Sequence, residues 1–115
     1  MLKLKTRYKI LATCFNKYGI PISKGENSYK KTHPLQAYFA EKVGHPQRIY
    51  LHAEILALIR AGDKKIDRVL IERRDKYGNN YPSKPCPICF EAIRAYGVKY
   101  IHYTDENHTL IMKIL

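Results

Sequence analysis

The chain has 115 residues, 45% of them hydrophobic and 27% charged, with a net charge of +11 at pH 7. This length predicts a single domain over residues 1–115 with one modest core. The sequence has no apolar run of the ~20 residues that span a membrane and no apolar secretion signal near its start, so we expect a cytoplasmic protein that does not enter a membrane. The basic charge favours an anionic partner, either a nucleotide phosphate or a polynucleotide, and is equally compatible with a merely solvated surface.

Strands and helices alternate along the predicted chain. After a short basic lead-in that could form a helical turn, the pattern of hydrophobic and turn residues predicts strands at 8–16 and 20–27, helices at 35–43 and 52–61, a strand at 67–74, a helix at 87–96, and strands at 98–103 and 109–115. Residues 76–84, rich in Gly, Asn, Pro and Ser, are predicted as a loop. The alternation predicts an α/β fold with helices on both faces of one sheet. The turn between the last two strands is too short for a crossover helix, so these strands should be antiparallel.

The three cysteines do not form a disulfide framework. Cys14 stands in the apolar run of residues 10–15 and is predicted to be a buried structural thiol. Cys86 and Cys89 form a C-x-x-C motif, which indicates metal binding or redox chemistry in a chain without a secretion signal.

Two motifs at predicted helix starts carry the chemistry: His52-Ala53-Glu54 and the Cys pair. Catalytic zinc sites use three nitrogen or sulfur ligands and leave a fourth position to water, which matches His52, Cys86 and Cys89. Glu54, two residues after His52, should sit beside the metal without binding it and transfer protons. Either motif alone is weak, since H-x-E can be incidental and C-x-x-C can be structural, redox-active or fortuitous. Together and in this order they match the signature H-x-E…P-C-x-x-C of zinc nucleobase deaminases.

From about residue 10 to residue 115 the chain resembles the cytidine/deoxycytidylate deaminase superfamily, and its compact length resembles phage-type dCMP deaminases. Besides the two metal motifs, the resemblance includes the segment Gly25-Glu-Asn27-Ser28 and the approach Ser83-Lys84-Pro85 to the Cys pair. It implies a three-layer α/β/α sandwich with a five-stranded mixed sheet whose last two strands are antiparallel. It implies a zinc-dependent hydrolase that converts cytosine to uracil in a (deoxy)cytidine nucleotide such as dCMP, and a homo-oligomer.

The resemblance also implies roles for individual residues. Zinc would be bound by His52, Cys86 and Cys89, and Glu54 would transfer protons. The remaining predicted substrate contacts are Asn27 for the base or sugar, the backbone of Ala53 for the base carbonyl, and the backbone near Ser83 or Lys84 for the departing amine. Asn27 could equally be a turn residue.

The loops beside these motifs offer further candidates. Tyr29 could stack on a base, and His33 and the Lys84 side chain could lie at the pocket mouth near a phosphate. Solvated loop positions or packing residues are the alternatives for all three.

Three functions remain open from the sequence. The first is a deaminase of mononucleotides. The second is a deaminase of cytosine or adenine in single-stranded DNA or RNA, which the +11 charge favours. The third is a zinc-stabilised binding module without turnover, which Glu54 argues against because a structural site needs no proton carrier.

Overall fold

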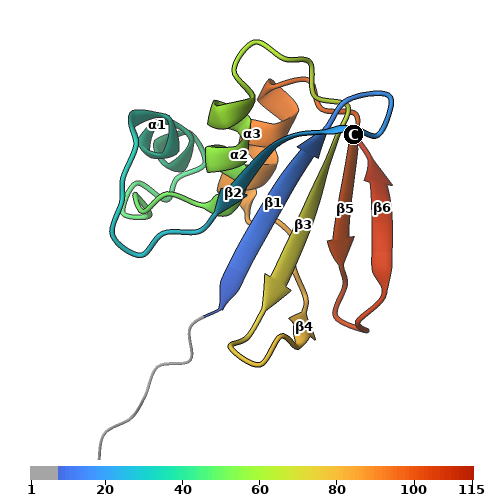
Figure 1. Ribbon diagram of the computed structural model, residues 1–115. Helices are drawn as coiled ribbons and strands as arrows, with labels where there is room; N and C mark the ends of the chain where they lie inside the picture. The colour runs from blue at the N-terminus through green and yellow to red at the C-terminus, as the bar shows by residue number, and fades with distance from the viewer. Residues whose placement is uncertain (1–7) are drawn as a thin grey trace, which may run out of the picture.

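The computed structural model describes residues 8–115, so the basic lead-in with its predicted helical turn lies outside the described residues (Figure 1). The elements in chain order are β1 (Lys9–Phe15), β2 (Pro21–Glu26), α1 (Pro34–Lys42), α2 (Ala53–Ala61), β3 (Arg68–Arg74), β4 (Asn80–Tyr81), α3 (Pro87–Ala95), β5 (Tyr100–Thr104) and β6 (Leu110–Ile114). Each of the five predicted strands and three predicted helices is present.

The strands form one mixed sheet in the order β2-β1-β3-β5-β6. β3 and β5 are parallel, and the other neighbouring pairs in this order are antiparallel, including the predicted final pair β5 and β6. The short strand β4 is an addition within the predicted loop of residues 76–84, and it pairs with the end of β3. The Asp75 carboxylate accepts hydrogen bonds from the backbone N–H groups of Tyr77 and Asn79, and Gly78 has φ 83°, which closes the chain into this small hairpin.

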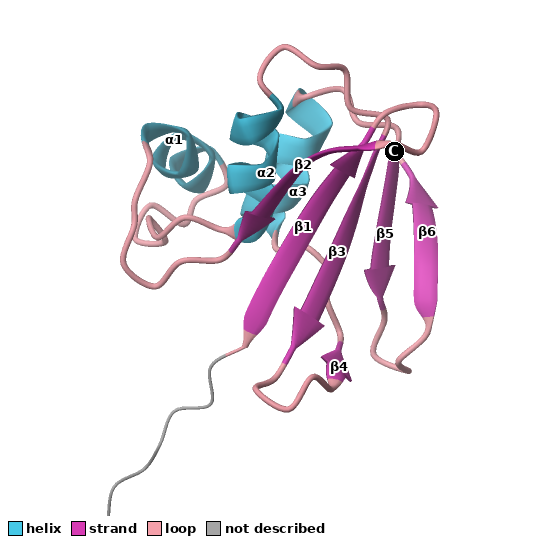
Figure 2. Ribbon diagram, in the orientation of Figure 1, coloured by secondary structure: helices cyan, strands magenta, loops and turns pink. Residues whose placement is uncertain are grey.

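All three helices of the described residues lie on one face of the sheet (Figure 2). β2 and β3 are both antiparallel to β1 and therefore parallel to each other. The crossovers from β2 to β3 and from β3 to β5 step in the same direction across the sheet, and right-handed crossovers then place their helices on the same face. Helices were expected on both faces. The α/β class and the mixed sheet are confirmed and consistent with a three-layer sandwich, and the helices of residues 8–115 cover one face of the sheet.

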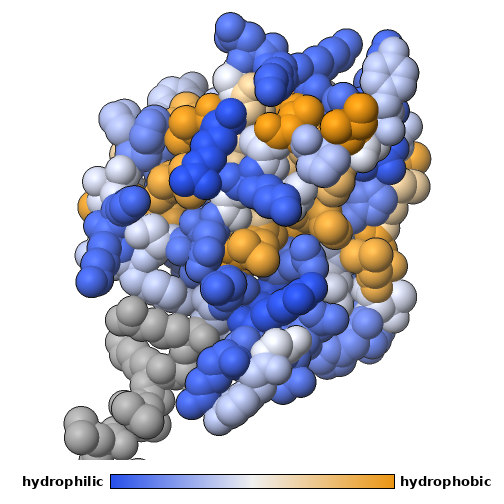
Figure 3. All heavy atoms as spheres, viewed as in Figure 1, coloured by the Kyte–Doolittle hydropathy of each residue, from blue (hydrophilic) through white to orange (hydrophobic). Residues whose placement is uncertain are grey.

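The core lies between the sheet and these helices. Alternate strand residues point into it, so Ala12, Val69, Ile71 and Ile101 are buried, and Cys14 among them is the buried thiol that the apolar run predicted. Burial raises the pKa of the Cys14 thiol, as expected for a packing residue. Figure 3 shows the opposite face of the sheet, on which hydrophobic groups are scattered among hydrophilic ones.

Strand β2 approaches helix α2 very closely. A Cβ added to Gly25 would lie 2.3 Å from the Ala53 carbonyl oxygen and 2.6 Å from the Ala57 nitrogen. The Ser23 hydroxyl donates a hydrogen bond of 2.8 Å to the Ala57 carbonyl. Because α2 begins at Ala53, this contact fixes the height of the first helical turn over the sheet.

Candidate metal centre and catalytic pocket

The starts of α2 and α3 bring three metal-ligating side chains together. The Nδ1 atom of His52 lies 3.1 Å from the Cys89 sulfur and 3.4 Å from the Cys86 sulfur, and the ligand atoms of the three residues all lie within 4.8 Å of one another. Zn–N and Zn–S bond lengths in a tetrahedral site place such atoms roughly 3.5 Å apart. The spacing and the donor types therefore fit a metal ion.

The side chains of His52 and Cys86 do not cap the helices that they precede, so both can bind a metal ion. His52 is the N-cap residue of α2 and Cys86 that of α3, and neither side chain caps its helix by a hydrogen bond. The fully buried Gln36 of α1 accepts a hydrogen bond from the His52 N–H at 3.1 Å and donates one to the Arg48 carbonyl at 3.3 Å. Gln36 thereby holds the backbone of the histidine ligand in place.

The electrostatics around the cluster favour one thiolate without a metal. The hydrogen bond from Cys89 contributes most to lowering the pKa of Cys86, and His52 adds to it, so that this pKa falls to about 4 despite burial. Burial, followed by the neighbouring Cys86, raises the pKa of Cys89 well above its usual range. Burial alone would lower the pKa of His52, but the hydrogen bond and negative charge of Cys86 raise it on balance. Cys86 is thus ready to bind a cation.

Glu54 lies in the first turn of α2, beside the ligands, with only 5% of its surface exposed. Burial is the main cause that raises the pKa of its carboxyl group. Glu54 borders a cavity of about 140 Å³ whose lining residues are Ile10, His52, Glu54, Ile71, Arg73, Pro82, Ser83, Lys84 and Cys86. A buried carboxyl group with a raised pKa therefore faces the same cavity as His52 and Cys86, two of the three candidate metal ligands.

The predicted substrate contacts near the Cys pair border this cavity. Ser83 is buried, and its hydroxyl donates to the Ile71 carbonyl at 2.7 Å and accepts from the Thr104 N–H at 2.9 Å. Lys84 is exposed and lies at the mouth. Ala53 is buried as the first residue of α2, between His52 and Glu54.

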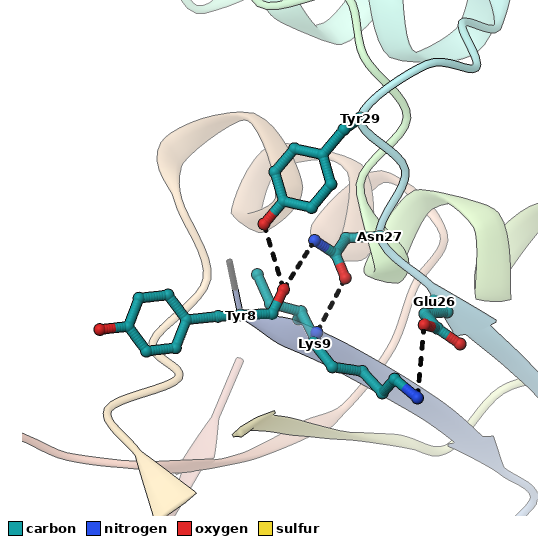
Figure 4. A network of polar contacts seen from close by, with 6 residues as sticks. Tyr8, Lys9, Glu26, Asn27 and Tyr29 are labelled. Atoms are coloured by element: carbon teal, nitrogen blue, oxygen red, sulfur yellow. Dashed lines mark hydrogen bonds and ion pairs between the residues drawn. The ribbon is translucent and has the colours of Figure 1, made fainter. Parts of the chain in front are cut away.

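Three of the predicted substrate contacts do not border the cavity beside Glu54: Asn27, Tyr29 and His33. The Asn27 side chain accepts from the backbone N–H of Ile10 at 2.8 Å and donates to the Tyr8 carbonyl at 3.2 Å, and the Tyr29 hydroxyl donates to that same carbonyl (Figure 4). Both residues line another cavity, of about 670 Å³, and not the one beside Glu54. His33 caps α1, accepting a hydrogen bond at Nδ1 from the Leu35 N–H at 3.0 Å.

Sequence reasoning missed Arg73 and Gln36. Arg73 lines the cavity beside Glu54 from the end of β3, and its buried Nε has no hydrogen-bond partner among the described residues. Its guanidinium stands 4.1 Å from the centre of the Tyr8 ring. The alternation of β3 could have identified it, because Arg73 shares a strand face with Val69 and Ile71.

The chain was compared with protein-family models, with curated proteins and with solved structures, and none of them matched. Within the part of the chain that the structure describes, no helix has the length and apolar character to cross a membrane. The function of the site has to be inferred from its own geometry: a cluster that could hold a metal ion, a buried carboxyl group beside it and a small cavity in front of both.

Proposed function

We propose that the chain is a zinc-dependent hydrolytic deaminase that converts cytosine to uracil in an anionic (deoxy)cytidine nucleotide such as dCMP. The observation that supports this most is the buried Glu54 beside a cluster of three ligands, His52, Cys86 and Cys89. A purely structural zinc site usually has four protein ligands and needs no carboxyl group next to it. Among residues 8–115 no fourth His, Cys, Asp or Glu joins the cluster.

One nitrogen and two sulfur donors suit zinc better than magnesium or calcium, which prefer oxygen. A zinc ion bound there would supply an activated water as the nucleophile. Glu54 can take a proton from that water and deliver it to the departing amine, so that one water is consumed and one ammonia released. Burial raises the pKa of Glu54, which makes its carboxylate a better proton acceptor than an exposed one.

The shape of the pocket supports a one-ring base. The cavity of about 140 Å³ is smaller than the roughly 300–1,000 Å³ of pockets that enclose whole ligands. It shares Arg73, Pro82 and Lys84 with an adjoining cavity of about 440 Å³. Asp105 and Glu106 also line the second cavity, so a phosphate would lie at the shared boundary, near Lys84 and Arg73. A cytosine ring in the first cavity and its phosphate at this boundary would give the unpartnered Nε of Arg73 an anionic acceptor.

The net charge of +11 favours the alternative substrate, a cytosine or adenine in single-stranded DNA or RNA. The chemistry at Glu54 would be the same, and only the extent of the bound anion would differ. A cytoplasmic location and a homo-oligomeric state stay predictions.

Ammonia release by the zinc-loaded protein tests the proposal. The panel comprises dCMP, dCTP, deoxycytidine, CMP, cytidine, guanine and single strands that contain one C or one A. Turnover of nucleotides alone supports the dCMP-type enzyme, and turnover of strands alone supports the alternative. A protein that binds zinc and turns over nothing on the panel would be the binding module.

Replacement of the carboxyl group tests the mechanism. We expect Glu54→Gln to keep its zinc, measured by elemental analysis, and to lose roughly 10²–10⁴-fold in kcat. The matched control is Glu91→Gln, the same change at a half-buried position on α3 whose carboxylate pairs with Lys42. Full turnover by Glu54→Gln would exclude the proposed proton transfer.

A further inference from the structure

A second cavity lies at the other end of the strands. It has a volume of about 510 Å³ and is formed by the turn between β1 and β2 and by the loops that lead into β3 and β5. In Figure 1 these connections gather at the end of the sheet where the C-terminus lies. Ile10 borders the catalytic cavity and Asn16 borders this one, so six residues of extended strand, about 20 Å, separate them.

Four lysines from three separate segments surround this cavity: Lys17, Lys64, Lys65 and Lys99. None of them forms an ion pair with another residue of the described range 8–115. The one carboxylate in the lining, that of Asp67, lies 3.3 Å from the Nε of Arg68. Four positive charges therefore face a single carboxylate that is already paired with Arg68, and a bound anion would relieve their repulsion.

The same cavity offers an aromatic ring and an apolar floor. Tyr18 is 75% exposed at its edge, and Ile22 and Ile66 line it from β2 and from the loop before β3. The Asn16 side chain accepts hydrogen bonds from the N–H groups of Tyr18 and Ile20, at 2.9 and 3.0 Å, so the turn that carries Tyr18 has a fixed backbone. The Lys17 ammonium lies 5.1 Å from the centre of the Tyr18 ring, so a base that stacks on the ring would bring its phosphates close to this lysine.

We propose that this cavity binds a phosphorylated nucleotide, with its base against Tyr18 and its phosphates among the four lysines. Its volume lies in the range of pockets that enclose a ligand of this size. A simple anion would contact only the lysines. A nucleotide would contact the lysines with its phosphates and the Tyr18 ring and nearby apolar side chains with its base. The nucleotide could be free in solution or part of a single strand. This site stands apart from the catalytic pocket and does not depend on deamination.

Titration calorimetry with thymine ligands tests this site separately, because thymine has no amino group to lose. The probes are dTTP, thymidine, inorganic triphosphate and the single strand dT10. We expect dTTP to bind more tightly than either thymidine or triphosphate. A strand that binds more tightly than dTTP would identify the nucleotide as part of a polynucleotide, and the reverse order would identify a free nucleotide.

Two pairs of variants test whether dTTP binds in the cavity that the four lysines surround. K64Q/K65Q should weaken dTTP binding by about tenfold or more, since two charge-assisted contacts to phosphate are lost. The control K30Q/K31Q removes the same charge from adjacent lysines that line none of the cavities described above. Tyr18→Ala should weaken dTTP binding and Tyr18→Phe should preserve it. Equal losses in both lysine pairs, no effect of Tyr18→Ala, or no binding of any probe would overturn the proposal.

Discussion

Gly25→Ala should displace the start of α2, which carries the proposed catalytic residue Glu54. The added Cβ would lie 2.3 Å from the Ala53 carbonyl oxygen and 2.6 Å from the Ala57 nitrogen, and both are backbone atoms that no side-chain rotation can move away. Ordinary van der Waals contact begins near 3.4 Å, so the start of α2 has to move from β2 by about 1.1 Å. His52 and Glu54 are carried by this segment and would move with it.

The expected size of the effect follows from that displacement. Overpacking of a rigid interface costs roughly 1–3 kcal/mol of unfolding free energy. A shift of about 1 Å in a catalytic group can lower the rate by roughly 10²-fold. We therefore expect Gly25→Ala to lose stability in urea denaturation and to lose about 10²-fold in kcat/KM for dCMP, with zinc still bound because all three ligands remain.

Gly44→Ala is the matched control. Gly44 has a positive φ of 84° and open space around its missing Cβ, so an alanine there is strained by roughly 1–2 kcal/mol but displaces nothing. It should lose comparable stability and keep its turnover. If Gly25→Ala were as stable and as active as the unchanged protein, the close approach of β2 and α2 would not position the site.

Three further predictions concern single side chains. In the metal-free protein iodoacetamide at pH 6 should alkylate Cys86, whose pKa of about 4 makes it a thiolate, and spare Cys89, whose pKa is raised; equal labelling in peptide mass spectra would contradict this. Gln36→Leu should cost about 1–3 kcal/mol in urea denaturation because it removes the partner of the His52 N–H, and unchanged stability would mean that this contact is dispensable. Arg73→Leu should raise KM for dCMP about tenfold and leave deoxycytidine turnover unchanged; an equal loss on both substrates would assign Arg73 a structural role.

The metal cluster could be predicted because its members are tied to local sequence. Cys86 and Cys89 are three residues apart at one helix start, and His52 opens another, so few spatial arrangements are compatible with the motifs. The side of the sheet that the helices cover could not be predicted in the same way. It depends on β1 lying between β2 and β3, which makes the outer two parallel, and this pairing has no signal in any single segment.

Long-range contacts decide the roles of the other candidates. Asn27 has a residue type that suits either substrate binding or a turn, and its actual partners are backbone groups of residues 8 and 10, seventeen or more positions away. Gln36 has no local sequence signal that distinguishes it from an ordinary polar residue of a helix, although it is fully buried and holds the His52 backbone. The hairpin of β4 depends on the Asp75 carboxylate, whose bonds to residues two and four positions later are a short-range signal in the sequence.

The two ends of the sheet differ in their electrostatics because of the direction of the helices. α2 and α3 both start at the catalytic end, where their positive dipole ends favour thiolates and an anionic substrate. Their negative ends point toward the second cavity and attract cations, but that attraction is worth only about 0.3–1 kcal/mol and fades beyond the last turn. Lys64, Lys65 and Lys99 follow the ends of α2 and α3 by three to four residues, and Lys17 belongs to neither helix. The helix dipoles therefore offset little of the repulsion within the lysine cluster, and a phosphate-bearing ligand remains the counter-charge that its geometry favours.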